Sequence, residues 1–186
     1  MHSQVPALAH RDVKVENVLL HDQQFKLADF GSASTDTLDY TTCAKHELAE
    51  RMELFEKHTT LMYRPPEMID RYLKYAVTPQ ADVWMLGCVI FTLCFARHPF
   101  AEAQKLAILN AQYTMPDEEH ERIGPQMRNL VRSMLTPDPS KRPTVGHLLH
   151  TVRKWDELST GPGVEEHKDL HQPSPGALQR KKRMEK

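Results

Sequence analysis

The sequence predicts a mainly α-helical fold with a few short β-strands, followed by a tail without fixed structure. Apolar residues recur at helical spacing from about residue 43 to residue 156. The first 40 residues instead hold short apolar runs between polar ones. With 186 residues, the chain is long enough for one domain with its own hydrophobic core.

The elements follow in order along the chain. The apolar runs at 18–20 and 25–28 suit short strands that flank loops. A helix is expected over 44–58, where Glu47 and Arg51 form a favourable i,i+4 pair, and Pro65-Pro66 is expected to end the helical pattern. Further helices are expected at 80–96, 101–112, 123–135 and 143–156, separated by proline-containing segments.

Charge and hydropathy narrow the class of protein. Lys and Arg number 24 against 25 Asp and Glu, for a net charge of -1, which argues against binding nucleic acid through bulk charge. No signal peptide is recognisable, and the longest apolar run, 83–96, is shorter than the about 20 residues that span a bilayer. We expect a cytoplasmic protein; the basic run Arg180-Lys181-Lys182-Arg183 leaves nuclear import or peripheral membrane contact as alternatives to a plain solvated tail.

Two short motifs carry the chemical information. Residues 10–17 read H-R-D-V-K-V-E-N, and residues 29–31, which begin twelve residues after Asn17, read D-F-G. The first resembles the catalytic loop H-R-D-x-x-x-x-N of protein kinases, and the second resembles their metal-binding D-F-G. Either motif alone is close to chance, but both in this order and spacing indicate a protein kinase.

The resemblance implies a role for each residue. Asp12 accepts the proton of the substrate hydroxyl, and Lys14 contacts the transferring phosphoryl group of ATP. Asn17 and Asp29 supply the hard oxygen ligands that Mg²⁺ prefers. Gly31 gives the backbone freedom for a sharp loop after Asp29. The structural or regulatory members of the two motifs are His10, Arg11, Phe30 and Gly31.

Later segments extend the resemblance over residues 1–156. T-L-M-Y-R-P-P-E at 60–67 is similar to the end of a kinase activation segment, with Pro65 in place of the usual alanine. Asp82 begins D-x-W-x-x-G at 82–87, and in this family that aspartate accepts backbone N–H groups of the catalytic loop. Arg142 is expected to form a structural ion pair with Glu67, the glutamate of the P-P-E sequence.

The same resemblance also implies which substrate hydroxyl is phosphorylated and to which subfamily the sequence is similar. Lys14 is typical of serine/threonine kinases, in which the hydroxyl of Thr60 bridges Asp12 and Lys14. Val15-Glu16 before Asn17 and a helix just before T-T-L-M-Y-R resemble the Numb-associated kinases, which include the adaptor-associated and cyclin-G-associated kinases. An ordinary activation loop that happens to favour helix is the alternative. The resemblance implies a protein substrate among endocytic adaptors, such as a clathrin-adaptor subunit.

Arg11 carries a prediction about regulation. In kinases this arginine usually pairs with a phosphorylated residue of the activation segment, helped by a second basic side chain after D-F-G. Between Ser32 and Ala44 the sequence has no Lys or Arg, and Asp36 and Asp39 are acidic. We therefore predict that the helix over 44–58, and not phosphorylation, orders this segment.

The sequence contains no glycine-rich phosphate loop and no lysine–glutamate pair of an N-terminal kinase lobe, and nine residues precede His10. We expect residues 1–156 to form the C-terminal lobe only, with Met1 an internal methionine of a longer protein, and residues 157–186 to form a disordered tail. ATP and Mg²⁺ are the expected cofactors, with ATP contacts from Lys14, Asn17, Asp29 and Leu19, the last under adenine. Two functions remain: phosphate transfer to protein Ser/Thr, and a non-catalytic lobe that binds partner proteins.

Overall fold

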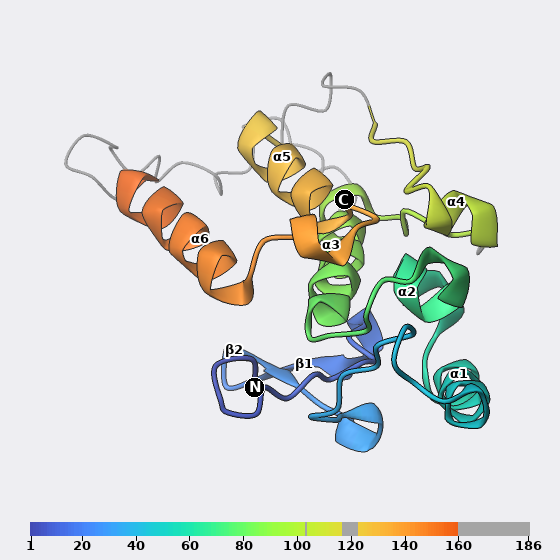
Figure 1. The fold of residues 1–186 in the computed structure, drawn as a ribbon. Helices are drawn as coiled ribbons and strands as arrows, with labels where there is room; N and C mark the ends of the chain where they lie inside the picture. Colours follow the sequence, from blue (N-terminus) through green and yellow to red (C-terminus); the bar gives the residue numbers. More distant parts are fainter. Residues whose placement is uncertain (103, 117–122, 160–186) are drawn as a thin grey trace, which may run out of the picture. The chain divides into compact units, whose positions relative to one another are not determined.

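The computed structural model describes residues 1–102, 104–116 and 123–159 (Figure 1). The chain divides into two units, Met1–Leu148 and Leu149–Lys186. The first unit carries all the elements discussed below except the later turns of the last helix. The second is described only by those turns, up to Ser159. The predicted tail at 157–186 therefore begins inside a helix, and residues 160–186, which include the basic run, lie outside the described residues.

The strands and α-helices match most of the expected elements. The described elements are β1 (Val18–His21), β2 (Gln24–Leu27), α1 (Lys45–His58), α2 (Pro66–Ile69), α3 (Gln80–Phe95), α4 (Lys105–Leu109), α5 (Pro125–Met134) and α6 (Val145–Ser159). Short 3₁₀ turns lie at Val15–Asn17, Phe30–Ser32, Leu61–Tyr63, Arg71–Leu73 and Pro139–Lys141. The prediction of a mainly helical fold with short strands is confirmed for the described residues.

The two strands form an antiparallel hairpin closed by Asp22 and Gln23. Both turn residues have left-handed backbone, with φ of 50° and 58°, as a two-residue hairpin turn that follows the strand twist requires. The register pairs Val18 with Leu27. The two chain ends that leave the hairpin, at 17 and 28, therefore lie opposite each other.

Helix α3 forms the centre of the first unit, because it is apolar on nearly every side and such a helix must be buried. Trp84 and Phe91 are fully buried, and Trp84 stacks on Phe100 with ring centroids 5.5 Å apart. Figure 1 shows α5 beside α3. A Cβ on Gly87 would lie 3.0 Å from Leu135 and from Met134, so glycine permits this close approach.

Two sequence predictions about helices are wrong in detail. The helix expected over 101–112 contains only Lys105–Leu109 as α4. Gln112 N–H donates to Ala107 O (2.7 Å) and Ala111 N–H to Ile108 O (3.0 Å), while Ala111 has φ of 48°; this is a helix-ending Schellman arrangement. Pro65-Pro66 also begins a helix, α2, because proline suits a first turn that needs no N–H donor.

Candidate active site

The catalytic loop is fixed to the first turn of α3 through the carboxylate of Asp82. The backbone N–H of His10 donates to Asp82 Oδ2 (2.7 Å), and that of Arg11 donates to Oδ1 (2.8 Å). The ring of His2 adds a third contact to Oδ2 at 2.8 Å. Arg11 has φ of 66°, a conformation that costs a non-glycine residue about 1–2 kcal/mol and that these bonds hold in place. The predicted contact of Asp82 with the loop backbone is present.

His10 connects the catalytic loop to the segment that carries D-F-G. Its Nε2 lies 3.0 Å from Ala28 O, and its Nδ1 accepts the N–H of Asp12 at 3.3 Å. These partners place the ring proton on Nε2. The ring of Phe30 meets His10 edge-on, with centroids 4.9 Å apart. Because His10 is completely buried, the two motifs are held together by a side chain that water does not reach.

Asp12 has one carboxylate oxygen engaged and one without a partner. Oδ2 lies 2.8 Å from Lys14 Nζ and accepts a hydrogen bond from Asn17 Nδ2 at 3.2 Å. The same Asn17 nitrogen donates to the backbone oxygen of Asp12 at 2.9 Å. Oδ1 is buried and has no hydrogen-bond partner in the described part of the chain. A buried unpaired acceptor is costly, so Oδ1 is the atom of this site that is ready to accept a hydrogen bond from a ligand.

Lys14, and not the hydroxyl of Thr60, is the central group of the expected bridge. Lys14 Nζ donates to Thr60 Oγ1 at 3.3 Å while it pairs with Asp12. The ammonium has three donors, so it contacts both oxygens at once, and among the described contacts Thr60 Oγ1 meets Lys14 and not Asp12. All three residues are brought together as predicted, but the ammonium joins the other two.

The hairpin register brings Asn17 and Asp29 to one end of the sheet. Ala28 N–H donates to Asn17 O (2.8 Å), and Asp29 follows directly with φ of 59°. The Asn17 amide turns its nitrogen to Asp12, so its oxygen is the atom left for a cation. Asp29 is exposed, and one of its oxygens accepts the N–H of Gly31 (3.2 Å). This pair of hard oxygen donors fits Mg²⁺ held jointly with phosphate oxygens.

Gly31 contributes in a different way from the one expected. Its φ is not positive, and the left-handed residue of this turn is Asp29. A Cβ on Gly31 would lie 3.1 Å from Asp29 Oδ1, so the absence of a side chain leaves room for that carboxylate. The backbone freedom predicted for Gly31 is not used.

A pocket of about 300 Å³ gathers most of these groups. Its lining includes Asp12, Lys14, Asp29 and Thr60, together with Lys57 and His58 from the last turn of α1. Leu19 lies on β1 outside this pocket, with 51% of its surface exposed. The pocket therefore brings two carboxylates and the ammonium groups of two lysines into one small space, a set of groups that suits phosphoryl transfer.

The ion pair predicted between Glu67 and Arg142 is present and completely buried. Arg142 Nη1 and Nη2 each lie 2.7 Å from one oxygen of Glu67. Arg142 also donates to three backbone carbonyls, of Thr136, Gln80 and Pro137, at 2.8–3.0 Å. Its guanidinium lies 5.2 Å from the centre of the Trp84 ring. The pair joins α2 to the loop before α6.

Several contacts at the site were not expected from the sequence. Arg64 donates to Glu56 O (2.9 Å), to Thr59 O (2.6 Å) and to Thr59 Oγ1 (2.6 Å), which satisfies carbonyls at the end of α1. Ser32 Oγ donates to His58 O at 2.8 Å. The position of Arg64 inside the T-T-L-M-Y-R motif was a usable signal, whereas His2 and Ser32 lie in no pattern that marks their partners.

The loop anchored on Asp82, the unpaired Asp12 oxygen and the adjacent Asn17 and Asp29 are features of a protein kinase domain. Residues 1–153 match the protein kinase domain, and the chain belongs to that family. Among the described residues, no helix is long and apolar enough to cross a membrane.

Three curated proteins are similar in sequence to this chain. Two probable serine/threonine-protein kinases of Dictyostelium discoideum are 40% identical over 154 residues and 38% identical over 156 residues. An actin-regulating kinase of Saccharomyces cerevisiae is 34% identical over 163 residues. The alignments cover 82–83% of this chain and 13–19% of the relatives. The chain thus corresponds to less than a fifth of the length of each relative.

Proposed function

We propose that this chain provides the catalytic-loop half of a serine/threonine kinase that transfers the γ-phosphate of ATP to protein hydroxyls. One observation carries the proposal: the buried Asp12 carboxylate has Oδ2 held by Lys14 and Asn17 while Oδ1 is unpaired. A substrate hydroxyl that donates to Oδ1 is oriented by it. Its proton passes to that oxygen as the hydroxyl oxygen bonds to the γ-phosphorus of ATP and the bond from that phosphorus to the leaving ADP breaks.

The remaining residues orient the reacting groups and neutralise the charge of the phosphates. Lys14 is placed by Asp12 and Thr60, so its ammonium stands beside the attacking hydroxyl, where negative charge develops on the phosphoryl oxygens. Asn17 and Asp29 are the residues that would hold Mg²⁺, which supplies positive charge to the phosphates when bound with ATP. Leu19 is exposed on β1 and supplies apolar surface for the adenine ring. Phe30 and His10 keep the two loops in register.

We further propose membership of the Numb-associated group. The V-K-V-E-N sequence supports it, as does the position of α1, which ends at His58 directly before T-T-L-M-Y-R. An endocytic adaptor protein is the proposed substrate class, and the cytoplasm the proposed compartment. The yeast relative named for actin regulation makes an actin-regulating protein a second candidate substrate.

A transfer assay tests the proposal. The 186-residue chain is incubated with labelled ATP, Mg²⁺ and a Ser/Thr-containing protein acceptor, beside Asp12→Asn and Asp29→Ala variants. We expect label only with the unchanged chain and at least a hundredfold less with either variant, because each variant removes charge that the transition state needs. Asp22→Asn, which changes an exposed carboxylate of the hairpin turn outside the pocket, is the matched control. Equal background from all four chains refutes autonomous catalysis and leaves the protein-binding lobe as the function.

A further inference from the structure

The side chain of Arg11 is directed to α1, although its backbone belongs to the catalytic loop. Its guanidinium carbon lies 5.8 Å from the centre of the Phe55 ring, and its Nη2 donates to the backbone oxygen of Asp36. Arg11 is 6% exposed and Phe55 is 4% exposed. The attraction between a cation and the face of an aromatic ring is stronger where water is excluded, up to about 2 kcal/mol. Arg11 therefore depends on α1 for its environment.

Asp36 connects Arg11 to a second arginine, Arg51 of α1. Its backbone oxygen accepts from Arg11, while its Oδ2 lies 3.2 Å from Arg51 Nη1. Arg51 is also 3.9 Å from Glu47 of α1. Burial lowers the pKa of Arg11, the charge of Arg51 lowers it further, and the Asp36 carboxylate acts in the opposite direction. The carboxylate of Asp36 thus offsets the repulsion between two neighbouring guanidinium groups.

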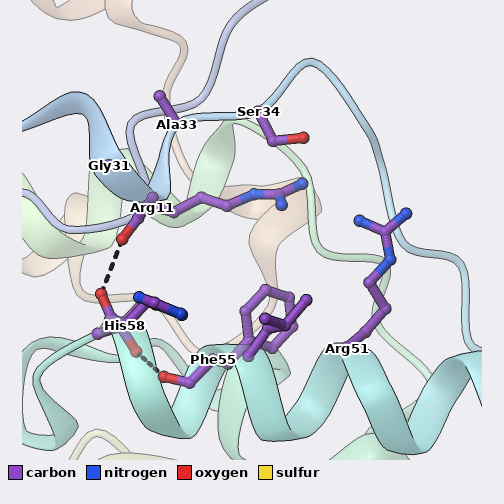
Figure 2. A pocket seen from close by; sticks show the side chains of 10 residues that line it. Arg11, Gly31, Ala33, Ser34, Arg51, Phe55 and His58 are labelled. Carbon is purple, nitrogen blue, oxygen red and sulfur yellow. Dashed lines mark hydrogen bonds between the residues drawn. The ribbon is translucent and has the colours of Figure 1, made fainter.

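Figure 2 shows this arrangement from close by: Arg11 extends over the ring of Phe55, and Arg51 rises from the same helix at one side. The residues line a pocket of about 230 Å³ between α1 and the segment that follows D-F-G. Ser32, which also lines this pocket, donates through Oγ to His58 O (2.8 Å). Helix α1 is therefore tied both to the catalytic loop and to the segment that follows D-F-G.

We propose that Phe55, Arg51 and Asp36 are positioning residues that hold Arg11, and through it Asp12, in place without a phosphate. The backbone of Arg11 is in the left-handed region, and Asp82 holds only its N–H. The side chain is the second support of this strained residue, and Asp12 is its immediate neighbour. Without the α1 contacts Arg11 is free to change its backbone conformation. The carboxylate of Asp12 then moves as well, because Asp12 is the next residue. The inference rests on the proposed function only for its effect on phosphate transfer.

An exposed Arg–Asp pair alone contributes about 0–1 kcal/mol, and this pair is partly exposed. The distinguishing feature is that Asp36 is shared between Arg51 and the buried Arg11. A positioning role predicts that a substitution at Arg51 destabilises the catalytic loop, whereas an ordinary surface pair predicts that the destabilisation is confined to α1 and its neighbours.

Amide hydrogen exchange of the whole chain tests this. We compare the unchanged protein with Arg51→Gln, Arg51→Lys and Phe55→Leu, and use Arg132→Gln on α5 as the matched surface control. Exchange in peptides that cover residues 8–14 should accelerate about fivefold in Arg51→Gln, which is the scale of one partly exposed ion pair. It should accelerate at least as much in Phe55→Leu, which removes the buried aromatic ring beneath Arg11. Arg51→Lys should retain most of the protection because it keeps the charge. Arg132→Gln should leave this segment unchanged.

Unchanged exchange at 8–14 in Arg51→Gln overturns the proposal, even if α1 itself loses protection. Arg51 lies on the surface, so this variant decides the matter if Phe55→Leu does not fold. Where the chain transfers phosphate, Arg51→Gln should lower kcat about fivefold with the KM for ATP unchanged, and Arg51→Lys should restore it. If the unchanged chain transfers no phosphate, the proposed function fails, while the exchange result still decides the positioning role.

Discussion

Replacing Glu67 by Gln tests whether the buried ion pair with Arg142 supports the fold. Both side chains are completely excluded from solvent and share two bonds of 2.7 Å. The substitution keeps the size of the side chain but leaves a buried guanidinium without its counter-charge, which typically costs about 3–5 kcal/mol. A domain of this size has about 5–15 kcal/mol in total, and each kcal/mol lowers Tm by about 2–4 °C, so Tm should fall by roughly 6–20 °C.

Urea unfolding followed by tryptophan fluorescence measures the loss, because Trp84 lies 5.2 Å from the Arg142 guanidinium. Glu47→Gln is the matched control, since it makes the same substitution at an exposed partner of another arginine, Arg51, at 3.9 Å. The control should change stability by less than about 0.5 kcal/mol. A Glu67→Gln loss below about 1 kcal/mol would show that Arg142 is held by its carbonyl partners alone, and the reasoning would be refuted.

Three further substitutions have defined outcomes. Asp82→Asn turns an amide N–H₂ toward one of two loop N–H donors, so urea unfolding should show a loss of about 1–3 kcal/mol. Gly87→Ala places a methyl group 3.0 Å from Leu135 and should cost about 1–3 kcal/mol in the same assay. An unchanged urea midpoint would mean that α5 moves away from α3 at no cost in stability. Burial lowers the pKa of His98 to about 4. The unfolded imidazole binds a proton near pH 6.5, so stability should fall as pH drops from about 6.5 to 4. His98→Asn, which keeps an acceptor for Phe100 N–H, should reduce this fall between pH 7 and pH 5, and an equally steep fall would contradict the assignment.

The sequence was sufficient for the features that depend on local patterns. The periodicity over 44–58 predicted α1 within one residue, and the two motifs predicted which side chains meet at Asp12. The end of α4 was missed because it depends on Ala111 in a left-handed conformation, and alanine gives no signal of it. Ala111 occupies the position at which glycine usually ends a helix.

Contacts between distant segments were predictable only where a family resemblance named the partners. Glu67 and Arg142 are 75 residues apart, and the resemblance was the only guide to their pairing. Arg51 was assigned to Glu47 from helical spacing, yet its shorter contact is to Asp36, in a segment without periodicity. Long-range electrostatic partners are chosen by the tertiary fold, and one sequence contains no local trace of that choice.

The hairpin turn at Asp22 and Gln23 has a consequence for the spacing of the two proposed Mg²⁺ ligands. Asn17 and Asp29 belong to different loops, and the strand pairing between them sets how far apart their oxygens stand. Strand pairing moves in steps of one residue, and each step turns the side chains to the opposite face. A change in the turn that moved the strand pairing by one step would therefore shift the two proposed ligands against each other by a whole residue, although the turn lies at the far end of the strands. The spacing of these two proposed ligands therefore depends on the register of the hairpin as well as on the identity of the two residues.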